Sequence, residues 1–141
     1  MKFYLDASFV VSLFISDTHT EKADRWITGQ QDEAIVSELC ALEFAAAVSR
    51  GVRTRRLAHK SAEETLGDFD GWRERATASH TLSPTDLALA GTLVRDFSTK
   101  LAAADALHLA ATINAGTTLV TFDERMAEVA LSRGVRVETL V

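Results

Sequence analysis

The chain of 141 residues is long enough to bury about two thirds of its unfolded surface, and we expect one domain over residues 1–141. Hydrophobic residues make up 47% and charged residues 25%, with seven glycines and one proline, which argues against a long disordered linker. The net charge of −5 gives no global sign of a nucleic-acid partner, although an acidic site that holds divalent cations supplies positive charge of its own. Cys40 is the only cysteine, which excludes an intrachain disulfide and a cysteine-rich zinc site.

The hydropathy pattern gives no sign of a membrane protein. No stretch approaches the roughly 18 uninterrupted apolar residues of a membrane span. The first apolar run contains Asp6 and Ser12 and has no long basic leader, so it is a poor signal peptide. We therefore expect a cytoplasmic protein without a membrane partner.

Strands and helices are predicted to alternate along the whole chain. Short β-branched, aromatic or alternating runs predict strands at residues 3–5, 33–37, 80–82, 118–121 and 135–140. Helical periodicity and stop signals predict helices at 7–15, 20–29, 39–48, 84–94, 101–111 and 122–133, and one helix or a helix pair over 54–76. This order is typical of a three-layer α/β domain with a largely parallel sheet flanked by helices.

Three acidic residues stand in apolar surroundings, where a charged side chain is costly unless it is paired or binds a metal. Asp6 lies between two apolar runs, Glu43 is the only charged residue of 39–48, and Asp105 is the only acid of 101–111. Asp123 directly follows the predicted strand at 118–121. Each has a structural alternative: Asp6 and Asp123 as helix caps, Asp105 in a first helical turn, and Glu43 paired with an arginine.

The predicted topology favours a common site for these acids. Sites in open parallel sheets form beyond the carboxyl ends of strands, and Asp6 and Asp123 both directly follow a predicted strand. The placement of Asp105 depends on the fold and does not follow from spacing. Several carboxylates in one place repel one another unless a cation joins them, and all-oxygen ligands favour Mg²⁺ or Mn²⁺. Such a site can polarise a phosphodiester and activate a water.

Four segments together resemble the PIN-domain family, and within it the VapC-type toxins of toxin–antitoxin systems. They are Phe3-Tyr4-Leu5-Asp6-Ala7-Ser8, Leu42-Glu43-Phe44, Ala103-Ala104-Asp105-Ala106-Leu107-His108-Leu109-Ala110 and Val120-Thr121-Phe122-Asp123-Glu124-Arg125-Met126. The resemblance spans essentially the whole chain and depends on the order of the four segments, since each alone is a weak signal.

This resemblance implies a metal-dependent endoribonuclease built on a five-stranded sheet of order 3-2-1-4-5. It implies that Asp6, Glu43, Asp105 and Asp123 are the catalytic residues and the ligands of Mg²⁺ or Mn²⁺. It further implies an RNA substrate, an antitoxin protein that covers the site, and a homodimer.

Further residues are candidates for supporting roles. Ser8 and Thr121 are expected either to orient carboxylates or waters or to form structural hydrogen bonds. His108 lies one turn after Asp105 and is expected at the edge of the site or in the core. The basic cluster is expected either to bind RNA phosphates or to be a solvated loop, and comprises Arg50, Arg53, Arg55 and Arg56.

Two classes without nuclease activity compete with this interpretation. A receiver-like signalling module needs an aspartate at the end of its third strand, where residues 80–83 read His-Thr-Leu-Ser. A catalytically inactive PIN-like interaction module is disfavoured by the presence of all four acids, and only an activity assay excludes it.

Overall fold

The computed structural model describes residues 1–140, and it places a parallel sheet between two layers of helices. The strands are β1 (Lys2–Leu5), β2 (Glu33–Ser37), β3 (Thr77–His80) and β4 (Thr118–Val120). The α-helices are α1 (Ala7–Phe14), α2 (Thr20–Gly29), α3 (Glu38–Arg53), α4 (His59–Ala76), α5 (Pro84–Arg95), α6 (Ala103–Ala115) and α7 (Glu124–Ser132), with a 3₁₀ turn η1 (Phe97–Thr99).

The side-chain alternation of β1 divides the core into two halves. Phe3 and Leu5 face the side covered by α1 to α4, whereas Tyr4 faces the side covered by α5, α6 and α7. The second half is built largely from the alanine-rich helix α6, whose small side chains allow it to lie close to the sheet. The three layers therefore follow from the period of two along the first strand.

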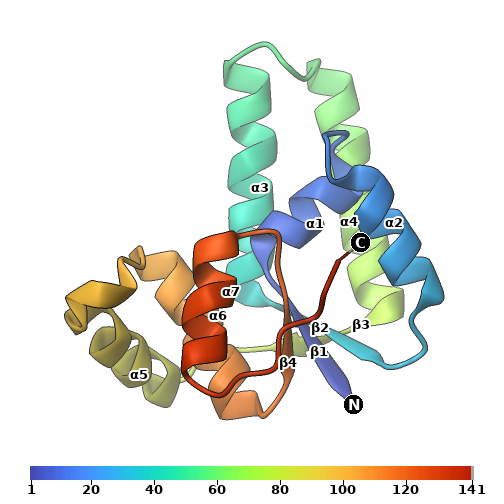
Figure 1. The fold of residues 1–141 in the computed structure, drawn as a ribbon. Helices are drawn as coiled ribbons and strands as arrows, with labels where there is room; N and C mark the ends of the chain where they lie inside the picture. The colour runs from blue at the N-terminus through green and yellow to red at the C-terminus, as the bar shows by residue number, and fades with distance from the viewer. Residues whose placement is uncertain (141) are drawn as a thin grey trace.

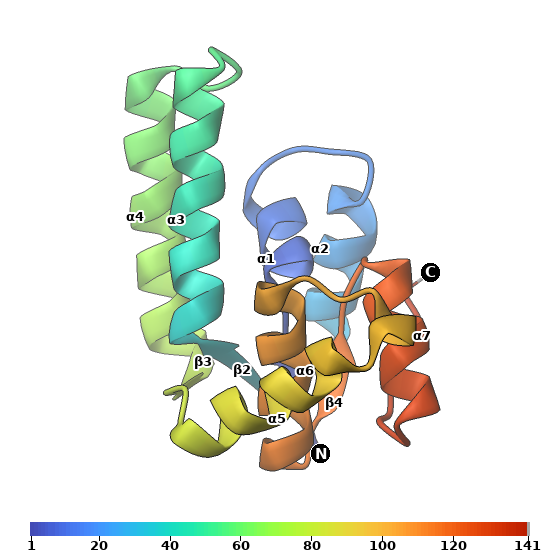
Figure 2. The ribbon, with the colours of Figure 1, turned by 90° about the vertical axis from the view of Figure 1, so that its left-hand side faces the viewer.

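The helices α3 and α4 form an arm that runs beyond the sheet, as Figure 1 and Figure 2 both show. Phe44 of α3 stacks on Phe69 of α4 with ring centroids 4.2 Å apart, and both rings are buried. Ser37 caps α3 through the backbone N–H of Cys40, so the helix begins directly at the carboxyl end of β2. Glu43 is thereby placed near the root of the arm.

The prediction of a five-stranded sheet is wrong. The order among the described residues is β3-β2-β1-β4, and the predicted fifth strand is reduced to one bridge between Leu119 and Val137. The Leu119 N–H donates to Arg136 O, and Leu119 O accepts from the Glu138 N–H, both at 2.9 Å. The pairing does not extend further, because β4 has only three residues.

Two other element boundaries also differ from those expected. The third strand covers Thr77–His80 rather than 80–82, because it pairs with β2 from Ala34 to Ser37 despite its lack of large apolar residues. The segment 54–76 contains a single helix, α4, preceded by a turn in which Arg55 has a φ of 61°.

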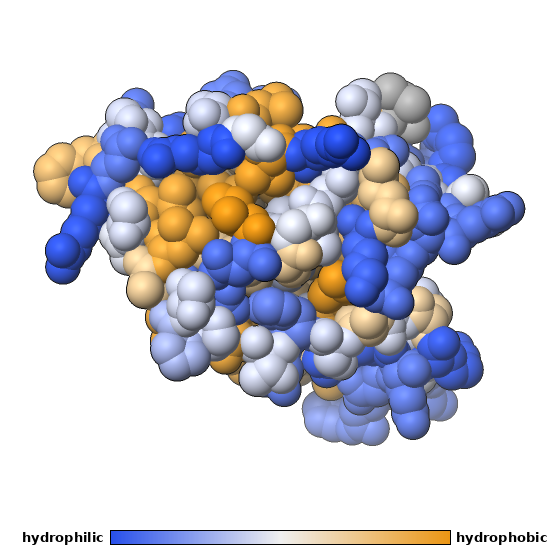
Figure 3. Space-filling view, turned by 90° about the horizontal axis from the view of Figure 1, so that it is seen from below, coloured by the Kyte–Doolittle hydropathy of each residue, from blue (hydrophilic) through white to orange (hydrophobic). Residues whose placement is uncertain are grey.

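Figure 3 shows the molecule from below, the face near the N-terminus. An apolar area lies on the left of this view, the same side on which α5 lies in Figure 1. Leu87 and Val94 are exposed apolar side chains of α5. Among residues 1–140, no helix combines the length and the apolarity that crossing a membrane requires.

Candidate functional site

Asp6 lies at the junction of β1 and α1, where it is only 1% exposed. Its Oδ1 accepts hydrogen bonds from the backbone N–H of Phe9 at 3.0 Å and from the hydroxyl of Ser8 at 2.7 Å. Its Oδ2 accepts from the hydroxyl of Thr121. Burial raises the pKa of Asp6 above its usual value, although these hydrogen bonds act in the opposite direction. Asp6 is therefore the N-cap of α1, and Thr121, which follows β4, holds its carboxylate in place.

Ser8, in the first turn of α1, and Thr121, the residue after β4, connect these two segments. Their hydroxyl oxygens lie 3.2 Å apart, and Ser8 Oγ accepts from the N–H of Phe122 at 3.0 Å. Thr121 Oγ1 accepts from the N–H of Asp123 at 2.9 Å. Asp123 in turn caps α7 by accepting from Met126 N at 3.0 Å. Two small hydroxyl side chains thus fix the positions of Asp6 and Asp123 relative to each other.

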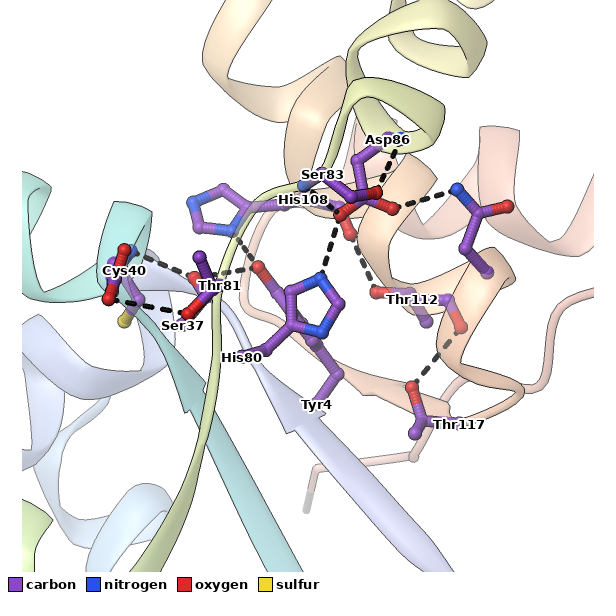
Figure 4. Close-up of polar contacts among 12 residues, drawn as sticks. Tyr4, Ser37, Cys40, His80, Thr81, Ser83, Asp86, His108, Thr112 and Thr117 are labelled. Atoms are coloured by element: carbon purple, nitrogen blue, oxygen red, sulfur yellow. Dashed lines mark hydrogen bonds and ion pairs between the residues drawn. The ribbon is translucent and has the colours of Figure 1, made fainter.

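Glu43 reaches a buried histidine of α6. Its Oε1 contacts Nε2 of His108, and the His108 ring is 1% exposed. On the other side of the ring, Nδ1 lies 2.8 Å from the hydroxyl of Tyr4, which donates to Ser37 Oγ at 2.9 Å. Figure 4 shows the Tyr4 hydroxyl between Ser37 and the imidazole. His108 is therefore a buried, fully engaged side chain that holds Glu43 by one carboxylate oxygen.

Asp105 lies in the first turn of α6 and is partly buried. Burial raises its pKa, and the negative charges of Asp123 and Glu43 raise it further, with a smaller effect from Asp6. His108 acts in the opposite direction. The charges of the three other predicted acids thus act on Asp105, although the four residues come from four distant parts of the chain.

A hollow of about 610 Å³, which we call the acidic pocket, is lined by two of the four acids, Glu43 and Asp123, whereas Asp6 and Asp105 are not part of its lining. Its lining includes Ser8, Glu43 and Asp123, together with His19, Arg50 and Phe122. Asp6 lies beneath it, hydrogen-bonded to Ser8. The pocket therefore combines carboxylates with one cation and two rings.

The oxygen donors of this pocket suit Mg²⁺ or Mn²⁺ better than zinc. Within residues 1–140, no three acid, histidine or cysteine side chains are already gathered as a metal-binding group. Mg²⁺ binds one or two carboxylates directly and keeps several waters, so its binding does not require three side chains that are already gathered. Oδ2 of Asp6 accepts one protein hydrogen bond, and a carboxylate oxygen has room for a second partner.

The four arginines of the basic cluster separate in the structure. Arg50 lines the acidic pocket and also an adjoining groove, which contains Val11, Ile15, Asp17, Ala47 and Arg56. Arg53 instead contacts Ser49 Oγ on the exposed side of α3 at 2.8 Å, and Arg55 lies in the following turn. Neither Arg53 nor Arg55 lines the pocket or the groove.

A second buried carboxylate was not anticipated from the sequence. Asp86 accepts from Asn114 Nδ2 at 2.7 Å and from Ser83 N at 3.1 Å, and its Oδ2 lies 2.8 Å from His80 Nε2 (Figure 4). Burial raises the pKa of Asp86, but these hydrogen bonds outweigh it and hold the pKa below its usual value. The available signal was Ser83 three residues before Asp86, a capping box, which predicts the helix start but not the contact with Asn114.

The PIN domain family model matches residues 3–131. The chain belongs to the PIN domain family. This result and the sheet order β3-β2-β1-β4 confirm the predicted family and the three-layer α/β architecture, apart from the number of strands. Comparison with curated protein sequences gives no match.

Several solved structures share this fold at low sequence identity. VapC20 of Mycobacterium tuberculosis, described as a toxin that cleaves the sarcin-ricin loop, is 18% identical with a TM-score of 0.73, over 90% of this chain and 94% of that one. VapBC2 of Rickettsia felis, bound to a promoter DNA fragment, is 17% identical with a TM-score of 0.69, over 98% of both chains. DNA-bound VapBC of Salmonella typhimurium is 16% identical with a TM-score of 0.71, over 98% and 97%.

Proposed function

We propose that this PIN domain is a Mg²⁺- or Mn²⁺-dependent endoribonuclease and the toxin of a VapBC-type toxin–antitoxin pair. The observation that supports it most is the match of residues 3–131 to the PIN domain family, and the pKa of Asp105, raised by burial and by the charges of Asp123, Glu43 and Asp6, supports the metal site. Such mutual repulsion is unfavourable in the free protein and favourable to a bound divalent cation. The likeness to VapC20 and to VapBC complexes adds support for the substrate class and the partner.

In this proposal Asp6, Glu43, Asp105 and Asp123 hold the metal. A divalent metal held there would supply a Lewis acid for the scissile phosphate and would lower the pKa of the attacking water. Thr121 and Ser8 orient the Asp6 carboxylate, and His108 fixes one oxygen of Glu43. Each of these three residues acts through a carboxylate rather than on RNA.

Arg50 and Arg56 are the members of the basic cluster best placed to contact RNA phosphates. Both line the groove that adjoins the acidic pocket, and Arg50 lines the pocket as well. Their positive charges offset part of the repulsion between an acidic protein and a polyanion. Arg50→Ala should weaken RNA binding and flatten its salt dependence, whereas Arg53→Ala, on the exposed side of α3, is the matched control.

The decisive test is cleavage of a mixed RNA pool by the purified chain with Mg²⁺, with Mn²⁺ and with chelator. We expect cleavage only with metal, and a loss of at least about 100-fold in Asp6→Asn and Asp105→Asn, each of which removes a ligand charge. Asp24→Asn, on the exposed side of α2, is the control for a lost carboxylate. Metal-independent cleavage, or an active Asp105→Asn, contradicts the proposed site.

Metal binding is tested separately by thermal melting. Mn²⁺ at 100 times its dissociation constant stabilises a native protein by about 2.7 kcal/mol, whereas a variant that has lost a ligand gains less at the same concentration. A chain that melts at the same temperature with and without metal, and cuts no RNA, fits the alternative of a catalytically inactive interaction module.

The partners follow from the same proposal. We propose that a small antitoxin protein covers the acidic pocket and that the toxin acts as a cytoplasmic homodimer. Expression from the native operon should yield a complex with the product of a neighbouring gene, and toxicity should appear only when that product is absent. A harmless, monomeric chain that binds no neighbouring product contradicts this part.

A further inference from the structure

Three aromatic rings form a column from the core to the wall of the acidic pocket. Phe9 of α1 is fully buried, and Phe122, which follows β4, stacks on it with centroids 5.8 Å apart and planes 16° apart. His19 stacks on Phe122 at 4.3 Å and 13°. Phe122 and His19 both line the acidic pocket, and His19 is exposed. The column therefore ends in the exposed His19 ring, which packs on Phe122, and Phe122 packs on the buried Phe9.

The loop that carries His19 is held by hydrogen bonds on several sides. The N–H of His19 donates to Asp17 Oδ1 at 2.8 Å, and Asp17 Oδ2 accepts from the Ser12 hydroxyl at 2.8 Å. The Thr20 hydroxyl donates to Ser12 O at 2.7 Å, which ties the loop back to α1. These bonds fix the backbone of the loop, and the stacking on Phe122 orients the His19 ring, so an approaching base would find a preformed surface.

The position of the column next to the acids indicates what it would bind. Phe122 is the residue directly before Asp123, and the same pocket contains Glu43 and Arg50. A phosphodiester beside Glu43 and Asp123 would place a neighbouring nucleotide within the same hollow of about 610 Å³. Aromatic side chains, including histidine, are the surfaces on which single-stranded RNA bases stack.

We infer that His19, supported by Phe122 and Phe9, is a stacking platform for a nucleobase adjacent to the scissile phosphate of single-stranded RNA. The inference rests on the proposed ribonuclease function and adds to it a subsite outside the four acids. Stacking accepts every base because each has a π face, so the platform selects unpaired RNA rather than one sequence. Paired or otherwise buried bases are excluded because they cannot reach the exposed ring.

The first test combines a substitution of His19 with RNA substrates that lack one base. Short single-stranded oligoribonucleotides that the wild type cuts are prepared with one abasic ribose at each position around the cut. We expect one abasic position next to the cut to reduce wild-type cleavage about tenfold or more. His19→Ala should cut the intact oligonucleotide about tenfold more slowly, mainly through KM, and lose its sensitivity to that abasic position. His19→Phe should recover both.

His59→Ala is the matched control, because His59 is an exposed histidine at the start of α4, away from the pocket. Mn²⁺-dependent melting of His19→Ala should equal that of the wild type, since His19 is not among the proposed ligands. If His19→Ala keeps wild-type cleavage and the full abasic sensitivity, the platform does not exist.

A binding measurement separates this inference from the proposed function. A short RNA with 2-aminopurine at one position is added to Asp105→Asn, which should bind without cutting. Quenching of its fluorescence that disappears in Asp105→Asn/His19→Ala supports the platform, even if the wild type cuts no RNA. Equal quenching in both variants, or none in either, overturns it. An absence of metal-dependent cleavage by the wild type overturns only the nuclease proposal.

Discussion

The hydroxyl of Thr121 donates a hydrogen bond to the carboxylate of Asp6, across 115 positions of the chain. The same oxygen accepts the N–H of Asp123 at 2.9 Å and lies 3.2 Å from Ser8 Oγ. One threonine at the end of β4 therefore relates two of the proposed metal ligands to each other. Thr121 follows Val120, the last residue of β4 that pairs with β1, and the Asp6 N–H donates to Val120 O at 3.2 Å.

Thr121→Val tests this relationship, because valine keeps the shape and removes the hydroxyl. The buried Asp6 carboxylate then lacks one donor and Asp123 N one acceptor, so we expect a loss of about 1–3 kcal/mol in the free energy of unfolding. Metal-dependent cleavage should fall more than tenfold, through a looser placement of both acids. Thr121→Ser retains the hydroxyl and should retain most of the activity; equal losses in both variants would show that only packing matters. Urea unfolding and initial cleavage rates provide the two measurements.

Tyr4→Phe tests the buried connection from Ser37 to Glu43. The phenol is buried, which raises its pKa far above the usual value, so it remains a neutral donor at any physiological pH. Without its hydroxyl, Ser37 Oγ and His108 Nδ1 each lose a buried partner. We expect a cost of about 1–3 kcal/mol in urea unfolding. Since Tyr4 does not touch Glu43, cleavage at saturating RNA should change much less than in His108→Leu.

The variant His108→Leu removes the contact with Glu43 directly. If Tyr4→Phe and His108→Leu reduce cleavage equally while differing in stability, then the imidazole does not position Glu43, and its role is only structural.

The sequence predicted the parts of the fold that local chemistry determines. Caps at Asp6, Ser83 and Asp123 and the glycine at Gly116 mark helix ends, and the alternation along β1 sets the two faces of the sheet. The third and fifth strands were predicted wrongly, because whether these segments form strands depends on the neighbouring strand and not on their own sequences. Thr77–His80 is a strand only because β2 lies beside it, and Val137 forms a single bridge because β4 is short.

For the candidate site as well, local features could be predicted from the sequence and long-range contacts could not. Three of the four acids were visible as charges in apolar segments and Asp123 as the residue after a predicted strand, and in the structure Glu43 and Asp123 line the acidic pocket. What joins them was not visible, since the contact of His108 with Tyr4 spans 104 positions and that of Glu43 with His108 spans 65. The column of His19, Phe122 and Phe9 also has no local pattern, because each ring comes from a different segment.

Asp86→Asn tests the buried cluster at the start of α5. The amide cannot accept from both Asn114 and Ser83 N while facing His80, so we expect a loss of about 2–4 kcal/mol at neutral pH. The pKa of Asp86 is lowered in the folded state, so its contribution is present above the unfolded value of 3.8 and is lost as the pH falls through the folded pKa. The difference from wild type in chemical unfolding should therefore shrink below about pH 4. A difference that stays constant down to pH 3 would mean that shape rather than charge holds the cluster.

Asp105→Asn is expected to stabilise the metal-free protein while abolishing metal-dependent cleavage. Its pKa is raised in the folded state by burial and by the neighbouring carboxylates, so the ionised form disfavours the native state. The destabilisation is absent below the unfolded pKa of 3.8, where Asp105 is protonated in both states, and develops as the pH rises through the folded pKa. At pH 7 with chelator, we expect the variant to gain about 1 kcal/mol and to melt a few degrees higher than wild type. The gain should vanish near pH 3 and should reverse in Mn²⁺, which stabilises the wild type through the ligand that the variant lacks. Asp24→Asn, exposed on α2, should show neither effect. If Asp105→Asn is less stable than wild type in chelator at pH 7, the carboxylate serves the fold rather than a cation, and the proposed metal centre loses its main support.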